Sequence, residues 1–274
     1  VVVSDADPVK RRDVVVVPVE EIEALEYGEC SRPQDVLGAR MADRSHVLVT
    51  AYFPEVDSVA VRVAGAKKEY KMEEADQQGY YGVLIPGRKI PEYVFMVEKK
   101  GKRREVPDAY AMDSLIDGMD MEKFINGCHD TIYDKLGAHP MTRDGAEGTY
   151  FAVWAPNARA VSVVGDFNQW REDAHPMIKR EPAGIYELFV PGVGKGDLYK
   201  FSIYQSTGNR VLKADPFANY AELRPATASV VWDLTKYSWK DEKWLARRSK
   251  WNSEKEPVLV YEVALGAFKK PKLA

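Results

Sequence analysis

The sequence predicts a mostly β protein with two tandem, immunoglobulin-like β-sandwich domains, and three observations support this class. A series of short motifs occurs twice in the same order, at an offset that drifts only from 99 residues (Leu37 to Leu136) to 107 residues (Asp108 to Asp215). Within each copy, apolar and polar residues alternate over runs typical of strands. The expected strands follow one another at intervals of about 10–15 residues without intervening helices, as in antiparallel sandwiches.

The repeated motifs pair one to one along the two copies. Those of the first copy are Leu37-Gly38-Ala39, Tyr52-Phe53-Pro54, Val59 and Val61, Gly79 and Tyr81, Pro86-Gly87, Tyr93-Val94-Phe95, and Asp108-Ala109-Tyr110-Ala111. Those of the second are Leu136-Gly137-Ala138, Trp154-Ala155-Pro156, Val161 and Val163, Gly184 and Tyr186, Pro191-Gly192, Tyr199-Lys200-Phe201, and Asp215-Pro216-Phe217-Ala218. Seven matches in one order indicate a duplicated domain.

The first copy is preceded by a short helix and is otherwise built of strands. Apolar residues at helical spacing predict a helix from Val19 to Tyr27, ended by Gly28. The segment 113–124, acidic and rich in methionine, is expected to be a loop and short helix between the domains. Strands are predicted at 47–53, 58–63, 80–85 and 93–98, with Pro-Gly and Gln-Gln-Gly turns between some of them.

The second copy has the clearer strand pattern, and a different kind of segment follows it. Trp244, Arg247, Arg248 and Trp251 predict one or two turns of amphipathic helix, with the tryptophan rings packed on neighbouring structure. The apolar run 257–263 is typical of a strand buried on both faces. The strands of the copy itself are predicted at 149–154, 160–165, 185–190, 198–204, 210–213 and 227–231.

Composition excludes several classes of partner and location. The 274 residues are 45% hydrophobic and 30% charged, with a net charge of −3 and interspersed signs, which predicts a globular protein without a nucleic-acid or anionic-membrane partner. Apolar runs are too short for a membrane span and no secretory leader opens the chain, so we expect a cytoplasmic protein. Cys30 and Cys128 are then expected to be free thiols rather than a disulfide.

The sequence shows no catalytic constellation, metal site or cofactor motif. Its four histidines, His46, His129, His139 and His175, are scattered and lack metal-ligand spacing. It also lacks a nucleophile elbow, a phosphate-binding glycine loop and a Cys-x-x-Cys pair. We therefore assign no catalytic residue, no metal and no cofactor.

One turn differs from this background. In Gly165-Asp166-Phe167-Asn168-Gln169-Trp170, the first residues favour a turn, which would place Trp170 at a loop tip or strand edge. An indole in that position suits the C–H face of a sugar ring. The alternative is that Trp170 folds back beneath the sandwich as a lid over the core.

A family resemblance supports the first alternative. The runs Gly148 to Ala158, Val161 to Trp170 and His175-Pro176-Met177 resemble the glycogen (1,4-α-glucan) branching enzymes, in the family 48 carbohydrate-binding module that precedes their catalytic barrel. The resemblance extends from about Leu136 to Phe268. The first copy resembles the extra N-terminal domain of many bacterial branching enzymes through Asp35-Val36-Leu37-Gly38, although Gln34 stands where that family usually has histidine.

The resemblance implies a ligand and its contacts. In the wider module family, which includes the glycogen-sensing β subunit of AMP-activated kinase, the tryptophan matching Trp170 stacks on glucose and the lysine matching Lys200 contacts sugar hydroxyls. We add Asp166 and Asn168 of the same turn as carbohydrate-binding residues. The implied partners are α-1,4-glucan, glycogen or maltooligosaccharides. A second stacking tryptophan of the kinase module has no counterpart, since Asn209-Arg210-Val211 occupies its region.

The resemblance also implies a parent enzyme that makes α-1,6 branch points through two-carboxylate, retaining chemistry. Tyr261 to Gly266 match the first strand of its (β/α)8 barrel, with Ala264 in place of the usual histidine. Such a barrel needs about 250 residues. Only 18 residues run from Pro257 to Ala274, so the catalytic carboxylates are expected to lie outside this sequence, in a barrel of the same polypeptide. The alternatives are a stand-alone glucan-binding or regulatory protein and a debranching enzyme of isoamylase or trehalohydrolase type.

These expectations divide the chain into six parts. Two sandwiches are expected at 29–112 and 136–233. The other parts are an N-terminal extension (1–28), a linker (113–135), a tryptophan-rich connector (234–256) and the start of a barrel (257–274).

Overall fold

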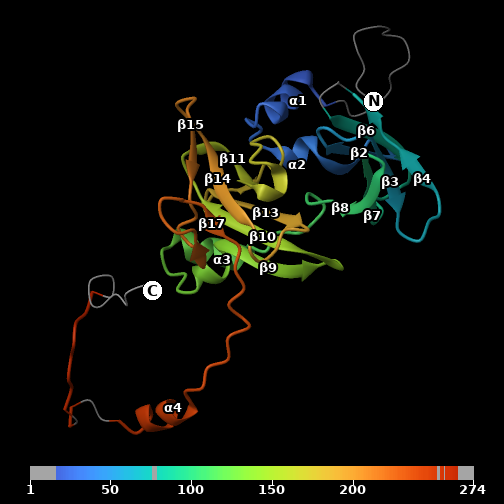
Figure 1. Ribbon diagram of the computed structural model, residues 1–274. Coiled ribbons are helices and arrows are strands. Elements are labelled where there is room, and N and C mark those ends of the chain that lie inside the picture. The colour runs from blue at the N-terminus through green and yellow to red at the C-terminus, as the bar shows by residue number, and fades with distance from the viewer. Residues whose placement is uncertain (1–16, 76–78, 252–253, 256, 265–274) are drawn as a thin grey trace, which may run out of the picture. The chain divides into compact units, whose positions relative to one another are not determined.

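The computed structural model describes residues 17–75, 79–251, 254–255 and 257–264, and the fold is mostly β, as predicted (Figure 1). Two compact units divide after Asp233. The first unit contains four antiparallel sheets, two from each copy of the repeat. The predicted Gln77-Gln78 turn residues, most of the N-terminal extension and residues 265–268 of the family match lie outside the described residues.

The first copy forms two facing sheets of four strands. One sheet has the order β1 (Gly38–Met41), β2 (His46–Tyr52), β6 (Tyr80–Pro86) and β5 (Glu73–Glu74). The other has the order β4 (Glu69–Lys71), β3 (Ser58–Val63), β7 (Tyr93–Lys99) and β8 (Lys102–Pro107). Side chains from both sheets form one core that includes Val49, Val61, Phe95 and Val97.

The second copy repeats this topology in most of its strands, but it has no counterpart of β4 and adds two strands at the edge of one sheet. One sheet has the order β12 (Ile178–Arg180), β13 (Ile185–Pro191), β10 (Ala146–Trp154) and β9 (Gly137–Arg143). The other has the order β11 (Ala158–Gly165), β14 (Leu198–Gln205), β17 (Ser229–Val230) and β16 (Tyr220–Ala221), and β15 (Arg210–Lys213) pairs with β14. Phe151, Tyr186, Tyr199 and Phe201 fill the core between them.

A buried Tyr–Asp hydrogen bond occurs at the same place in both sandwiches. Tyr199 donates to the Asp215 carboxylate at 2.6 Å, and Tyr93 donates to Asp108. Each aspartate also accepts the backbone N–H two residues later, at 2.8 Å. Burial raises the pKa of both carboxyl groups. Tyr93 and Asp108 of the first copy thus form the same hydrogen bond as Tyr199 and Asp215 of the second. The duplication seen in the sequence therefore extends to side-chain contacts.

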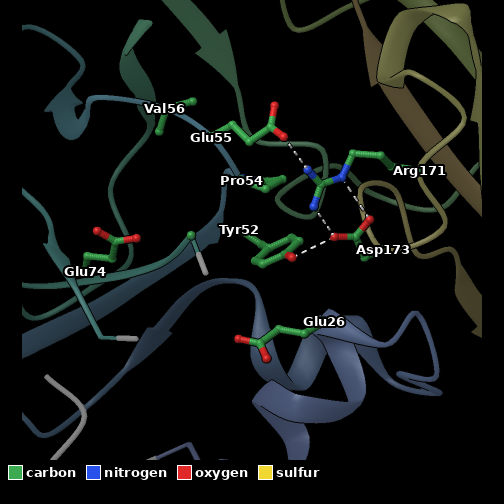
Figure 2. Close-up of a pocket in the computed structure, with 9 residues that line it drawn as sticks. Glu26, Tyr52, Pro54, Glu55, Val56, Glu74, Arg171 and Asp173 are labelled. Atoms are coloured by element: carbon green, nitrogen blue, oxygen red, sulfur yellow. Dashed lines mark hydrogen bonds and ion pairs between the residues drawn. The ribbon is translucent and has the colours of Figure 1, made fainter. Parts of the chain in front are cut away.

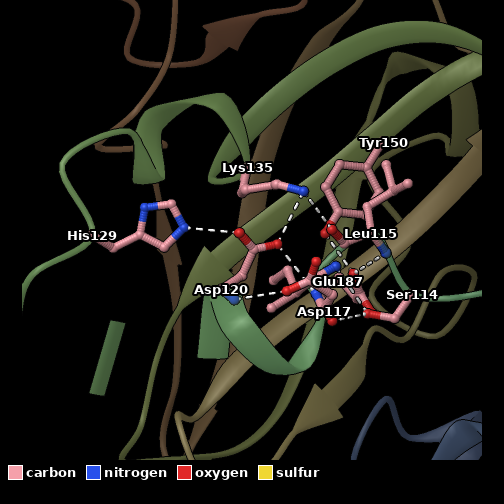
Figure 3. Close-up of polar contacts among 9 residues, drawn as sticks. Ser114, Leu115, Asp117, Asp120, His129, Lys135, Tyr150 and Glu187 are labelled. Carbon is pink, nitrogen blue, oxygen red and sulfur yellow. Dashed lines mark hydrogen bonds and ion pairs between the residues drawn. The ribbon is translucent and has the colours of Figure 1, made fainter. Parts of the chain in front are cut away.

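The linker between the sandwiches contains a short helix held by polar contacts (Figure 3). Helix α3 (Gly118–Ile125) starts at a capping box in which Asp117 and Asp120 each accept the other's backbone N–H. The Lys135 ammonium lies 3.0 Å from Asp120 and donates to the Leu115 carbonyl at 2.8 Å. His129 bonds the other Asp120 oxygen at 3.0 Å. The predicted loop and short helix are therefore confirmed.

The remaining helices are short. Helix α1 (Val19–Glu26) is followed within two residues by Gly28, whose φ of +65° terminates it, as predicted for a glycine-ended helix. Helix α2 (Pro33–Val36) follows it, and α4 (Glu242–Arg248) lies in the second unit. Single helical turns occur at Ile132–Asp134 and at Asp166–Asn168.

Two expectations for the C-terminal part differ from the structure. Residues 257–264 form no strand, and Leu259 is 98% exposed. A strand requires a neighbour for its backbone hydrogen bonds, and no described strand pairs with this run. The α4 region is helical as expected, but its rings pack only locally: Trp244 contacts Trp251 and Trp239 contacts Tyr237, and all three tryptophans stay exposed within the described part of the second unit. Cys30 and Cys128 are free, as predicted.

Candidate functional site

The turn after β11 is built by its own polar groups. The Asn168 amide accepts the Gly165 N–H at 2.9 Å and donates to the Val163 carbonyl at 2.9 Å, so it closes the end of the strand. Gln169 and Trp170 then take left-handed φ values of +57° and +60°, which are uncommon outside glycine. The Trp170 N–H returns to the Gly165 carbonyl at 2.9 Å. These bonds hold the backbone of Trp170 against the end of β11.

The Trp170 side chain is half-buried and bonded to the same turn. Its indole N–H donates to Asp166 at 2.8 Å, which satisfies the polar edge of the ring. The ring that packs on the core at this end is Phe167, stacked on Phe151 with a centroid separation of 6.1 Å. Since Phe167 takes the lid position, Trp170 keeps part of its surface open to solvent.

Lys200 lies close to this turn because of the strand register. In the β11–β14 pair, Val164 stands opposite Lys200 and Gly165 stands opposite Tyr199. Tyr199 and Phe201 point into the core, so Lys200 projects from the outer face of the sheet. Its ammonium donates to the Thr227 hydroxyl at 2.7 Å. Lys200 therefore stands on β14 opposite the last residues of β11, next to the strand end from which the Trp170 turn begins.

The structure thus joins Asp166 and Trp170 by a hydrogen bond and places Lys200 on the neighbouring strand, opposite the end of β11. Asn168 is buried and its amide is occupied within the turn, so its place in the site is to shape the backbone. Thr227 was not identified as a site residue from the sequence: it was predicted only as the first residue of a strand, and the observed strand β17 begins two residues later.

The first sandwich lacks the equivalent groups. At the position of Lys200 in the repeat stands Val94, and β3 is joined to β4 by the short loop 64–68, which contains no aromatic residue. The two copies therefore share the sandwich framework, and the candidate site belongs to the second copy alone.

His175 packs against the turn, and its burial leads us to expect that the stability of the second sandwich falls in acid. The Asn168 amide donates to its Nδ1 at 2.9 Å, and its ring packs on Phe167 at 5.7 Å. Burial lowers the pKa of His175 to about 4, against a smaller opposing effect of the nearby Asp173 charge. A proton on Nδ1 would face the amide N–H of Asn168, so the turn requires the neutral imidazole.

Because this folded-state pKa is lower than the unfolded one, His175 contributes fully to stability above pH 6.5 and loses its contribution as the pH falls toward 4. His175→Gln should reduce the slope of the unfolding free energy across this range by about 1.4 kcal/mol per pH unit, the value for one proton. Urea titrations at several pH values would measure it. His46→Gln, at a surface histidine bonded to Asp43, is the control, and an unchanged slope in His175→Gln would contradict the assignment.

A polar cavity of about 440 Å³ lies beside the residues that follow Trp170 (Figure 2). Tyr52, Glu55 and Glu74 line it from the first sandwich, and Arg171 and Asp173 line it from the second. Figure 2 shows the Arg171 guanidinium between the Glu55 and Asp173 carboxylates, with the Tyr52 hydroxyl pointing to Asp173.

Within the described residues, no three or more His, Cys, Asp or Glu side chains are grouped so that they could hold a metal ion. None of the described helices has the length and apolar character needed to cross a membrane.

Comparison with known proteins assigns both sandwiches. Residues 18–110 match the alpha-1,4-glucan branching enzyme GlgB N-terminal domain, and residues 135–218 match carbohydrate-binding module 48 (isoamylase N-terminal domain). The chain is 39% identical over 258 residues to the 1,4-alpha-glucan branching enzyme GlgB of Thermosynechococcus vestitus, and 41% identical over 255 residues to that of Gloeobacter violaceus. These alignments cover 93% and 92% of this chain.

The chain spans 34% of the length of each of these two relatives. Among solved structures, a pullulanase from Anoxybacillus sp. LM18-11 is 23% identical and covers 74% of this chain and 28% of its own, with a TM-score of 0.32, an overlay too poor to bear on function.

Proposed function

The chain corresponds to the N-terminal region of the GlgB 1,4-alpha-glucan branching enzymes, and from this premise we propose that its second sandwich binds linear α-1,4-glucan at Trp170 and Lys200. The observation that carries the proposal is the Trp170 indole, which is held by Asp166 at the end of β11 while the core below it is covered by Phe167.

The ring can contribute a useful part of the binding energy. Covering about 100 Å² of indole with the C–H face of a glucose unit contributes about 2.5 kcal/mol. One or two hydrogen bonds from Lys200 and Thr227 add about 1 kcal/mol each. After the costs of association, dissociation constants in about the millimolar to high micromolar range follow for a single chain end.

Trp170→Ala tests this proposal. We expect about tenfold or greater weakening of maltoheptaose and glycogen binding, because the stacking surface is removed. The thermal midpoint should stay within a few degrees, because Phe167 and not Trp170 packs on the core. Retardation in glycogen-containing native gels and calorimetric titration would measure binding.

Trp154→Ala is the matched control. Trp154 is a second partly exposed tryptophan of the same sandwich, its indole N–H is also bonded, to the Ala183 carbonyl at 3.0 Å, and it lies on β10, in the opposite sheet from Lys200. Its replacement should leave glucan binding unchanged. The proposal fails if Trp170→Ala binds glucan as the unsubstituted chain does, or if only Trp154→Ala loses binding.

For the whole protein, we propose a cytoplasmic branching enzyme in which this region holds the polyglucan and supports a catalytic barrel supplied by the same polypeptide. The match of residues 18–110 to the branching-enzyme N-terminal domain favours this over a debranching enzyme. The matches at 18–110 and 135–218 support two consecutive sandwiches, and we propose the extension, linker, connector and barrel start as the remaining parts.

A further inference from the structure

The segment that directly follows Trp170 is held by the N-terminal part of the chain. The Tyr52 hydroxyl donates to Asp173 at 2.7 Å across 121 positions of sequence (Figure 2). Arg171 reaches the same carboxylate through two nitrogens, at 2.7 and 3.2 Å, and approaches Glu55 at 3.4 Å. Arg171 and Asp173 therefore form one polar cluster with two side chains of the first sandwich.

The charge state of Asp173 suits this cluster. Burial raises the pKa of its carboxyl group, but the hydrogen bonds from Arg171 and Tyr52 outweigh that effect and leave the pKa below its ordinary value. The carboxylate is therefore ionised at neutral pH and accepts from both donors at once.

Glu172 lies between Arg171 and Asp173 and is linked to the N-terminal part of the chain by a different set of contacts. Arg210 pairs with its carboxylate at 2.9 Å and also donates to the carbonyls of Tyr27 and Gly28, at 2.6 and 3.2 Å. Gly28 lies so close to this segment that a Cβ there would be 2.9 Å from the Glu172 carbonyl oxygen. All three residues after Trp170 are thus in contact with, or linked to, residues 27–55.

These contacts bear on Trp170 through the backbone. Gln169 and Trp170 both hold left-handed φ values, and such conformations persist where the flanking chain is held in place. On one side, Asn168 anchors the turn to β11. On the other side, the anchors are the contacts of residues 171–173.

We propose that the first sandwich positions the glucan-binding loop of the second, with Tyr52, Glu55 and the Gly28 turn holding residues 171–173 so that the Trp170 indole is presented to the sugar. This inference rests on the proposed glucan site. It gives the first sandwich, which has no tryptophan–lysine pair of its own, a part in sugar binding as a positioning element.

Tyr52→Phe in the 274-residue chain tests the inference with two readouts. Hydrogen–deuterium exchange of the peptide that covers residues 166–175 should become faster, because Asp173 loses its donor from the first sandwich. Maltoheptaose binding should weaken about three- to tenfold, as expected when one hydrogen bond that orders the loop is lost. Both are measured well below the thermal midpoint.

Tyr80→Phe is the matched control. It removes another tyrosine hydroxyl of the first sandwich, one that donates internally to the Val36 carbonyl at 2.9 Å. This variant should lower the thermal midpoint and leave both the exchange of residues 166–175 and the glucan affinity unchanged. A purely structural effect of losing a tyrosine hydroxyl would instead appear alike in both variants.

The inference is overturned if Tyr52→Phe leaves either the loop exchange or the affinity unchanged, or if Tyr80→Phe changes both as strongly. Failure of the underlying glucan site is recognised separately, since Trp170→Ala would then bind maltoheptaose as tightly as the unsubstituted chain.

Discussion

Gly165→Ala is expected to abolish measurable glucan binding and to destabilise the second sandwich by about 3 kcal/mol. The φ of Gly165 is −176°, an extended value that any residue can adopt, so the effect is one of space. A Cβ at this position would lie 2.1 Å from the Leu198 carbonyl oxygen and 2.5 Å from a ring carbon of Phe167. The oxygen belongs to β14, the strand paired with β11, and can move only if the two strands separate where the Trp170 turn begins.

Gly118→Ala provides the matched control, because a Cβ there meets nothing within 4 Å and the residue opens helix α3. This change should leave the stability unchanged or increase it by about 1 kcal/mol, since alanine is the better helix former. Urea unfolding and maltoheptaose titration of both variants would measure the contrast. Wild-type stability and affinity in Gly165→Ala would show that the strands tolerate the methyl group.

Arg180→Ala should cost about 3 kcal/mol of unfolding free energy, because it leaves a buried carboxylate without its cation. Glu187 is 2% exposed and receives hydrogen bonds from the Tyr150 hydroxyl, from Arg180 and, at 3.3 Å, from the Leu115 N–H. Once the guanidinium is removed, only neutral donors remain around the charge. Since Leu115 belongs to the linker, the linker should loosen as well (Figure 3).

Two further variants separate the charge effect from the loss of packing. Arg143→Ala removes an arginine of the same sheet that donates to the Asp113 carbonyl at 2.9 Å from an exposed position, and should cost less than about 1 kcal/mol. Glu187→Gln added to Arg180→Ala should recover part of the lost stability, because the buried charge is then absent. Equal losses in Arg180→Ala and Arg143→Ala, measured by urea unfolding, would contradict the role of the buried pair.

Local patterns predicted the central strands of both sandwiches and the α1 helix closely, but missed several edge strands, among them β8 and β9 with six and seven residues. The strand predicted at 58–63 and the helix predicted to end at Gly28 agree with β3 and α1. Strands β5, β12 and β16 contain two or three residues each, too few to show a period of two. They exist because longer neighbours offer them unpaired backbone groups.

Some residues of the candidate site could likewise be predicted from the sequence, and others were revealed only by the structure. Trp170 could be found because turn-forming residues precede it, and Lys200 because the resemblance marked it. Thr227 comes beside Lys200 only through the folding of the second sandwich, 27 positions apart in sequence. The sequence did not show that Asn168 shapes the turn instead of contacting sugar. That role depends on its bonds to the carbonyl of Val163 and the ring of His175, which only the structure reveals.

The sequence by itself determined the duplicated β-sandwich class, the matching Tyr–Asp positions and the turn that carries Trp170, because alternation, glycines and turn residues act over a few neighbouring positions. Only the tertiary structure decided which ring covers the core, which polar groups are occupied internally, and that Tyr52 reaches Asp173. Residues 257–263 illustrate the same division, since their composition favours a strand that forms no pairing among the described residues. Local propensity selects a backbone conformation, whereas contacts between distant residues depend on how whole sheets pack.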